Sequence, residues 1–270
     1  DKNNYLQGKI KKSKNNIKDN FYSSKINKSF EIFINKGVKI FVDKKNKIIN
    51  LNYLNDEGRV IISDSKIESW TIRMHNVSKE KKKEFDNTYN LTGCLTVIDS
   101  LLNKVNISGE NFNCEDTINF IRSFGSLNNI QIKNSKSDSL DADFSQLKFN
   151  FVSIEKSLND CIDFSYGTYE IKNANLKNCA DKAISIGEKS EVKFDNIDIE
   201  SSDTGIVSKD SSKTYINKTQ IKNSKVCLSA YKKKHEFNGS FLEVNNLKCE
   251  DFDNKFLQDD KSILVIKNEF

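Results

Sequence analysis

The chain has 270 residues, of which 36% are hydrophobic, and its 43 Lys and Arg against 38 Asp and Glu give a net charge of +5. This mixed charge argues against the dense basic surface of a nucleic-acid-binding protein. No stretch approaches the ~20 apolar residues of a membrane-spanning helix, so we expect neither nucleic acid nor a membrane span. With no proline and only 10 glycines, the turns must depend on Asn, Asp, Ser and Lys.

The N-terminal part of the chain is less regular than the rest. Residues 1–29 are polar and rich in Lys and Asn, which predicts an N-terminal cap or linker ahead of a second unit, residues 30–270. Alternating apolar residues then predict short strands in irregular coils, at residues 38–42, 48–51, 60–62 and 67–72. A charged and aromatic insertion, Ser78–Asn90, interrupts this pattern.

From Asp116 onward the sequence repeats about every 22 residues. One aliphatic position returns in every repeat, at Ile118, Leu140, Ile162, Ile184, Ile206 and Leu228. Two further apolar columns follow it, so each repeat holds three short strands. One coil cannot bury its own apolar face, whereas stacked coils bury a continuous column. The sequence therefore predicts an all-β fold, a single-stranded right-handed parallel β-helix solenoid with about 22 residues per coil.

A second insertion, Tyr231–Ser240, lengthens one repeat near its C-terminal end. Loops inserted at one place on a solenoid often build a binding face. A tolerated surface insertion is an equal alternative, and the residues leave both interpretations open.

The repeats resemble a known group of proteins. Residues 138–144 (DSLDADF), 160–165 (DCIDFS) and 205–212 (GIVSKDSS) carry the resemblance, which extends over residues 30–270. They resemble the right-handed parallel β-helix superfamily that includes pectate lyases, and within it the β-helix modules of bacterial surface or secreted proteins. Some of those modules accompany spore-coat-type (CotH-like) protein kinase domains. The resemblance implies the fold and carries no catalytic assignment, since lyase motifs rich in Arg and Pro are absent.

Outward positions of the first strand hold the candidate catalytic residues. Asp141 and Asp163 are one coil apart, at ~4.8 Å, and Asp143 follows on the same strand. Carboxyl groups this close could shift one another's pKa values and act as acid and base in glycoside hydrolysis, or could bind Ca²⁺, the only cofactor we consider. Lys209 is the candidate base for a lyase or epimerase. Solvated polar residues on a solenoid surface are the alternative.

Other polar and aromatic residues are candidates for substrate binding near these carboxylates: Asn119, Arg122, Tyr166, Tyr231 and His235. A separate row, Asp116, Asp138 and Asp160, begins each first strand. We expect its carboxylates to bond the turn backbone, with calcium binding as the alternative.

Six cysteines follow the repeat without any zinc-ligand spacing. We expect them to be small, buried and reduced, and a disulfide between neighbouring coils is the alternative if the chain is secreted.

We therefore expect an extracellular or cell-surface module that binds or processes a polysaccharide along a groove over the first strand. If it is an enzyme, it is a polysaccharide lyase, an epimerase or a glycoside hydrolase. The alternative is a non-catalytic structural or adhesion module that mediates protein–protein or cell-envelope contacts within a larger assembly. An enzyme requires a recessed site with a perturbed ionisable group, whereas a scaffold requires only an exposed face.

Overall fold

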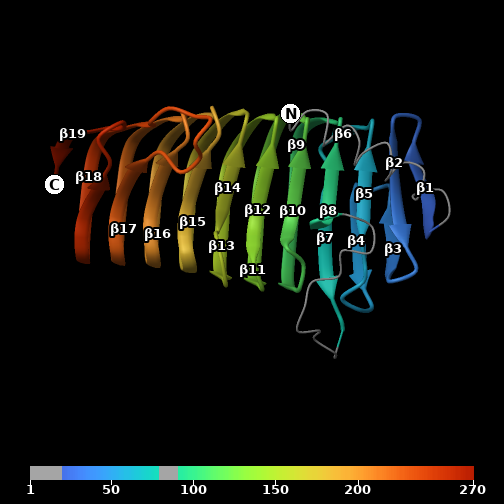
Figure 1. Ribbon diagram of the computed structural model, residues 1–270. Coiled ribbons are helices and arrows are strands. Elements are labelled where there is room, and N and C mark those ends of the chain that lie inside the picture. The colour runs from blue at the N-terminus through green and yellow to red at the C-terminus, as the bar shows by residue number, and fades with distance from the viewer. Residues whose placement is uncertain (1–19, 79–90) are drawn as a thin grey trace.

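The computed structural model describes residues 20–78 and 91–270, and these form an elongated β-solenoid of about 10 turns (Figure 1). Parallel strands stack coil upon coil, with equivalent residues about 22 positions apart in the chain. The predicted all-β parallel solenoid is confirmed. No α-helix in the described ranges has the length and apolarity required to cross a bilayer.

The N-terminal end of the solenoid consists of antiparallel hairpins. Strand β2 pairs antiparallel with both β1 and β5, and β3 pairs antiparallel with β4. Residues 38–42 thus belong to a hairpin, and not to an irregular coil as predicted. Strands β1 and β2, on either side of residue 29, pair with each other. The division of the chain into two units at this residue stays a prediction. The four strands are β1 (Phe21–Asn27), β2 (Phe30–Asn35), β3 (Val38–Asp43) and β4 (Ile48–Tyr53).

Parallel pairing begins with the next strands, where β4 pairs with β7 and β5 pairs with β8. The first parallel coils contain β5 (Val60–Ser63), β6 (Lys66–Glu68), β7 (Thr71–Asn76), β8 (Gly93–Ile98) and β9 (Leu101–Phe112). The insertion predicted at Ser78–Asn90 lies, apart from Ser78, outside the described residues.

The regular coils follow from residue 116. In the later coils the third strand of one coil runs on into the first strand of the next, which gives long continuous strands. The strands are β10 (Asp116–Ile121), β11 (Phe124–Ser135), β12 (Asp138–Asp143), β13 (Gln146–Ser157), β14 (Ile162–Ser165), β15 (Thr168–Gly187), β16 (Glu191–Lys209), β17 (Lys213–Tyr231), β18 (Phe241–Gln258) and β19 (Ile263–Glu269).

The predicted inner column of aliphatic residues is present and in register. Ile118 pairs with Leu140, Leu140 with Ile162, and the pairing continues through Ile184 and Ile206 to Leu228. All six side chains are fully buried. Neighbouring coils on both sides exclude water from each of them, so stacking buries the apolar surface of these six coils.

At many turns a residue other than glycine adopts the left-handed backbone conformation. Asn134, Asn178 and Asn223 turn the chain after the third strand with φ between 56° and 57°. Asparagine tolerates this conformation better than most residues, because its short amide can bond the local backbone. The predicted use of Asn in the turns is confirmed.

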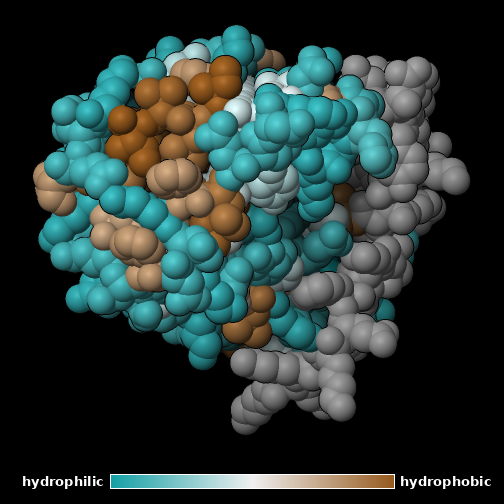
Figure 2. Space-filling view, turned by 60° about the vertical axis from the view of Figure 1, so that its left-hand side comes forward, coloured by the Kyte–Doolittle hydropathy of each residue, from teal (hydrophilic) through white to brown (hydrophobic). Residues whose placement is uncertain are grey.

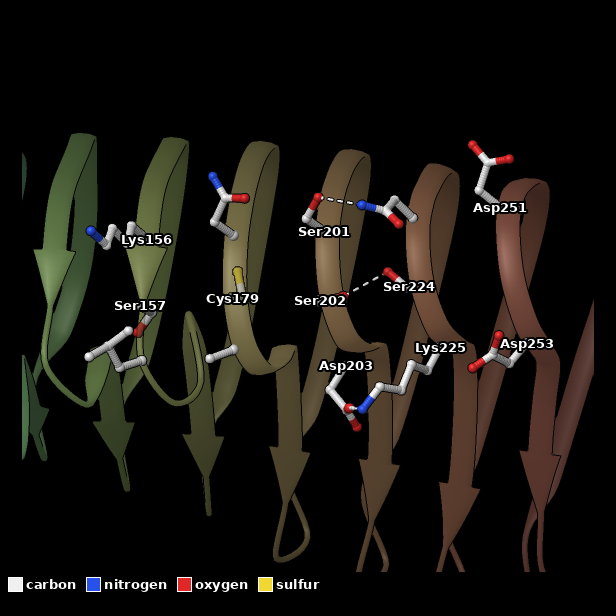
Figure 3. A pocket seen from close by; sticks show the side chains of 14 residues that line it. Lys156, Ser157, Cys179, Ser201, Ser202, Asp203, Ser224, Lys225, Asp251 and Asp253 are labelled. Carbon is white, nitrogen blue, oxygen red and sulfur yellow. Dashed lines mark hydrogen bonds and ion pairs between the residues drawn. The ribbon is translucent and has the colours of Figure 1, made fainter.

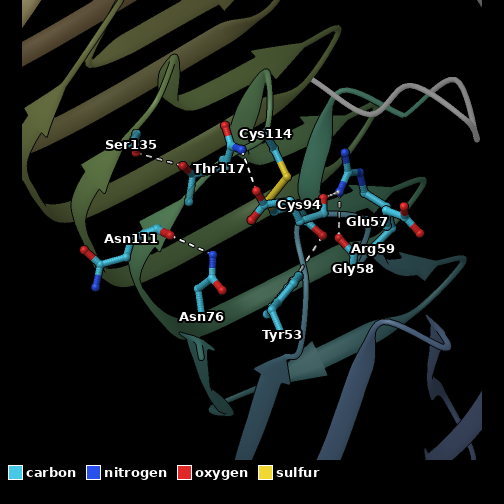
Figure 4. The surroundings of a disulfide bond; sticks show 12 residues. Tyr53, Glu57, Gly58, Arg59, Asn76, Cys94, Asn111, Cys114, Thr117 and Ser135 are labelled. Atoms are coloured by element: carbon cyan, nitrogen blue, oxygen red, sulfur yellow. Dashed lines mark hydrogen bonds between the residues drawn. A yellow bond between two sulfur atoms is a disulfide. The ribbon is translucent and has the colours of Figure 1, made fainter. Parts of the chain in front are cut away.

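All six cysteines form disulfides, so the expectation of reduced side chains is wrong. The pairs are Cys94–Cys114, Cys161–Cys179 and Cys227–Cys249. Each disulfide joins residues 18 to 22 positions apart and so closes roughly one coil upon itself. The surroundings of Cys94–Cys114 are buried and bonded, with the Tyr53 hydroxyl donating to the Cys94 carbonyl at 3.1 Å (Figure 4).

The C-terminal end of the solenoid exposes apolar side chains. Figure 2 brings this end forward and displays hydrophobic residues gathered on it. Phe256, which pairs with Leu228 in the inner column, is 52% exposed because no coil stacks on it in the described structure. The exposed apolar residues here are Phe252, Phe256, Leu257, Ile263 and Phe270.

We predict that Ile184→Ala lowers the free energy of unfolding by about 2–5 kcal/mol, since it leaves a cavity in the middle of the inner column. Urea denaturation followed by circular dichroism measures the change. Asn150→Ala, at an exposed position of β13, is the control and changes stability by less than about 0.5 kcal/mol. Equal losses for the two variants would contradict the assigned column.

Candidate functional site

The predicted acidic residues lie together on the outer surface of the first strands. Asp141 pairs in register with Asp163 on the next coil and with Asn119 on the preceding one. The turn row lies beside this column, since the Asn119 amide bonds both Asp141 and Asp116. We call the surface formed by Asp116, Asp138, Asp141, Asp160 and Asp163 the acidic face.

Asn119 connects the two rows of carboxylates. Its side-chain amide donates to Asp141 Oδ2 at 2.7 Å and to Asp116 Oδ2 at 3.1 Å. A third contact, at 3.2 Å, reaches the hydroxyl of Thr92. Asn119 is only 3% exposed. Its role in substrate contact stays a prediction. In the structure it positions two carboxylates.

Two residues of the turn row, Asp138 and Asp160, bond to backbone amides as predicted, whereas Asp116 accepts a bond from the Asn119 side chain. Asp138 Oδ1 accepts hydrogen bonds from the Asp160 amide at 2.8 Å and from the Asn159 side chain at 2.7 Å. Asp160 Oδ1 in turn accepts a bond from the Lys182 amide at 2.9 Å. One coil's carboxylate thus fixes the backbone of the following coil, and this ladder holds the carboxylates within a short distance of one another.

Crowding and burial raise the pKa values of the acidic face. Burial is the largest cause, and it raises the pKa of Asp138 to about 8, with further repulsion from Asp160 and Asp116. The same two effects raise the pKa of Asp116 and of Asp160 to about 6. Burial and the charge of Asp116 hold the pKa of Asp141 well above its usual value. Asp138 therefore keeps a proton at neutral pH, which suits a hydrogen-bond donor or a general acid, and the pKa of Asp141 is shifted in the same direction.

Three polar atoms in this column, on three of four successive coils, are buried without a hydrogen-bond partner. They are Thr96 Oγ1, Asn119 Oδ1 and Asp163 Oδ1, and they lie in the same register column as Asp141. Thr96 and Asn119 are 2% and 3% exposed. Because a buried polar atom without a partner costs stability, such atoms mark a place where a ligand or an ordered water belongs.

Lys209 reaches the same column from two coils away. Its ammonium group donates to the Ser185 hydroxyl at 2.8 Å, and Ser185 pairs in register with Asp163. The Lys209 side chain is 7% exposed. The structure thus places this predicted base at the end of the acidic column, and its catalytic role stays a prediction.

An aromatic cluster borders the acidic face at the turn that follows the first strand. The rings of Phe144 and Tyr166 are stacked with centroids 4.7 Å apart, and Phe237 packs edge-on against Tyr166 at 6.2 Å. Phe144 and Tyr166 each come three residues after a carboxylate of the face, Asp141 and Asp163, on the same two coils. Sequence reasoning found Tyr166 and missed both phenylalanines, although the 22-residue step from Phe144 to Tyr166 was a readable signal.

The C-terminal insertion, Tyr231–Ser240, packs against the solenoid through specific bonds. Asp210 Oδ1 accepts hydrogen bonds from the backbone amides of Lys233 and Lys234, each at 2.7 Å. The Lys234 ammonium pairs with Glu188, and Phe237 is buried. The insertion therefore contributes a ring to the aromatic cluster.

Other predicted substrate-binding residues lie away from the column or are already bonded. Arg122 forms two bonds of 2.7 Å to the carboxylate of Asp99. Tyr231 pairs in register with Lys209 and is half-buried. His235 is exposed in the insertion, where its carbonyl accepts a bond from Lys232. Asp143 pairs in register with Ser165 on the next coil.

The predicted calcium site is not preformed in the part of the chain that the structure describes. No three His, Cys, Asp or Glu side chains within it are arranged to hold a metal ion. Calcium binding by Asp141, Asp143 and Asp163 stays a prediction, and no step of the proposed function depends on it.

A separate concavity of about 670 Å³ lies at the corner that follows the third strand (Figure 3). Its lining is polar and bonded to itself, for example through Asn223 and Ser201 at 2.9 Å and through the ion pair of Lys225 with Asp203. None of the predicted site residues lines it. Among the described residues, none of the buried polar atoms without a partner belongs to its lining, so it gives no comparable indication of a ligand.

Comparison of the chain with protein-family models, with curated proteins and with solved structures finds no significant match. The structure supports the parallel solenoid fold, and membership of the pectate-lyase superfamily stays a prediction.

We predict that Asp138→Asn reduces the pH dependence of stability. The pKa of this carboxyl is raised in the folded chain, so its stabilising contribution is complete below about pH 4 and is lost as the pH rises through about 8. The wild type should lose more stability than the variant between about pH 5 and about pH 8. Urea midpoints at both pH values measure this, with the exposed Asp198→Asn as control. Identical slopes in wild type and Asp138→Asn would contradict the raised pKa.

Proposed function

We propose that the chain is an extracellular solenoid module that binds a polysaccharide across the acidic face and the neighbouring aromatic cluster. The observation that carries the proposal is the adjacency of the two features: a row of carboxyl groups on consecutive coils, bordered by the stacked rings of Phe144 and Tyr166.

The two features match the two parts of a sugar ring. Carboxyl oxygens and amides bond hydroxyl groups, and aromatic rings pack against the C–H faces of the ring. The repeat of ~4.8 Å between coils presents like groups at regular intervals along the solenoid. An extended glycan chain is a ligand with a similarly regular series of hydroxyl groups.

An extracellular location is part of the proposal, and the three disulfides support it. Disulfides form and persist in oxidising compartments and are rare in reducing ones. Their presence on both sides of the acidic face, at Cys94–Cys114 and at Cys227–Cys249, is compatible with a secreted or surface-exposed module.

Processing of the bound glycan is the finer form of this proposal. Asp141, whose pKa is raised by burial and by the charge of Asp116, could act as the general acid, with Asp163 on the next coil as the second carboxylate. Lys209 could serve as the base if the reaction is an elimination or an epimerisation instead.

We predict that the double variant Asp141→Asn/Asp163→Asn binds glycans at least about tenfold more weakly than the wild type, because hydrogen bonds to charged or proton-sharing groups are the stronger ones. Binding to a panel of soluble polysaccharides is measured by affinity electrophoresis, and a reducing-end assay on the same panel measures turnover.

The control for this experiment is Asp195→Asn/Asp198→Asn, which removes the same number of carboxylates from exposed positions of β16. Unchanged binding by the Asp141/Asp163 variant would remove the acidic face from the function. Absence of binding by the wild type to the whole panel would remove the proposed function itself.

A structural or adhesion role is the second candidate, and the exposed apolar residues of the C-terminal coil favour it. We propose a second copy of the chain as the partner. Residues 20–53 contain seven Lys against two acidic residues, whereas residues 241–270 contain four Lys against seven acidic residues. In addition, β1 is antiparallel to β2, which is antiparallel to β5, so β1 runs in the direction of the first strands. The N-terminal end of one copy could thus extend the C-terminal end of another.

We predict that Phe256→Ser/Leu257→Ser abolishes concentration-dependent association, since both side chains are about half exposed at this end. Sedimentation velocity over a range of concentrations measures it, and high salt weakens any association that depends on the opposite charges. Leu158→Ser, an exposed leucine away from this end, is the control. A wild type that stays monomeric at all concentrations would exclude this candidate.

A further inference from the structure

The outward column that contains Asp141 is closed to solvent over most of its length. Between the end strands its members, coil by coil, are Ile61, Thr96, Asn119, Asp141, Asp163, Ser185, Val207 and Ser229. All of these residues are at most 5% exposed except Asp141 and Asp163, which are partly exposed. The acidic face is therefore open to a ligand over two neighbouring coils, and we call this opening the two-coil window.

Leu91 and Thr92 close the window on its N-terminal side. Leu91 packs on a small apolar cluster that lies on the outer surface of the preceding coils and consists of Phe21, Ile61 and Ile98. The Thr92 hydroxyl accepts a bond from the Asn119 amide at 3.2 Å, and its carbonyl accepts the Asp116 backbone amide at 3.1 Å. A glycan that ran along the solenoid axis toward the N-terminal end would meet these residues.

Lys209 and the C-terminal insertion close the other side of the window. The Lys209 side chain reaches from its own coil to the Ser185 hydroxyl at 2.8 Å and is 7% exposed. At the next position of the chain, Asp210 holds the insertion in place by accepting bonds from the backbone amides of Lys233 and Lys234. A glycan that followed the solenoid axis would therefore have to end, or leave the surface, at both limits of the window.

Along the strands the described residues do not close the window in this way. Asp138, Asp141 and Asp143 on β12 are all partly exposed, and so is Phe144 at the turn that follows. On the next coil the same holds for Asp163, Ser165 and Tyr166. The run from Asp138 to Phe144 spans ~20 Å at ~3.3 Å per residue, about the length of four sugar units.

We infer that a glycan crosses the solenoid parallel to the first strands, from Asp138 to the stacked rings of Phe144 and Tyr166, and that the window holds a linear segment of about four sugar units. This inference rests on the proposed polysaccharide binding and gives the ligand a direction and a length. Asp141 and Asp163 then flank the two edges of the glycan, because neighbouring coils are ~4.8 Å apart. The aromatic rings receive the unit at the far end of the segment.

The experiment measures the binding enthalpy of the full chain by isothermal titration calorimetry, with cello-, xylo-, manno- and galacturonic acid oligosaccharides of increasing length. Enthalpy reports the contacts that form, whereas affinity also rises with the number of registers that a longer chain can adopt. In any series that binds, we expect the enthalpy to grow up to about four units and then to stay constant. An open track along the solenoid would instead give an enthalpy that grows with every added unit.

Phe144→Ala removes a ring at the far end of the window, so its enthalpy should stop growing about one unit earlier than that of the wild type. The matched control is Phe124→Ala, which removes a 45% exposed ring outside the window and should keep the limit of the wild type. Growth beyond about six units, a limit at about one or two units, or the same limit in wild type and Phe144→Ala would overturn the inference and leave the proposed binding standing. Binding to none of the series would remove the proposed function.

Discussion

The in-register stacking of like side chains from coil to coil is the constraint on which every other feature depends. Ile118, Leu140 and Ile162 occupy equivalent places on successive coils, and each is fully buried within one core that runs through the coils. A slip by one residue would turn this column outward and bring the neighbouring polar column into the core. The same register that buries the aliphatic residues therefore aligns Asn119, Asp141 and Asp163 on the outer surface. The packing of the core and the arrangement of the candidate site therefore depend on the same register.

The fold could be predicted from the sequence because its signal is repeated. A step of 22 residues places one aliphatic column, one small-residue column and one polar column in the same order on the regular coils. The inward or outward assignment of a position on one coil can therefore be checked against the equivalent positions on the others. The N-terminal hairpin β3–β4 lacks this redundancy, and its strands were assigned to irregular coils. Alternation alone does not distinguish a hairpin from a coil, since both have strands with one buried face.

The candidate site could be predicted only where it follows the repeat. The pairing of Asp141 with Asp163 is a direct consequence of the period, but the pKa values of Asp138 and Asp141 depend on burial, which spacing does not reveal. The disulfides were missed for a related reason. Cys161 lies in the small-residue column and Cys179 in the turn after the third strand, and these two columns meet across the inside of a corner. On an earlier coil the equivalent residues, Thr117 and Ser135, are joined by a hydroxyl hydrogen bond of 2.8 Å.

The antiparallel hairpins at the N-terminal end bear on the order in which the molecule assembles. A hairpin such as β3–β4 brings together residues that are close in the chain, so little loop entropy is lost when it closes. Every later coil must close a loop of about 22 residues before its strands gain a partner. The least costly first step is therefore at the N-terminal end, and its strands then offer a template edge to the next coil. Assembly in this direction matches the order in which a ribosome or a secretion channel releases the chain.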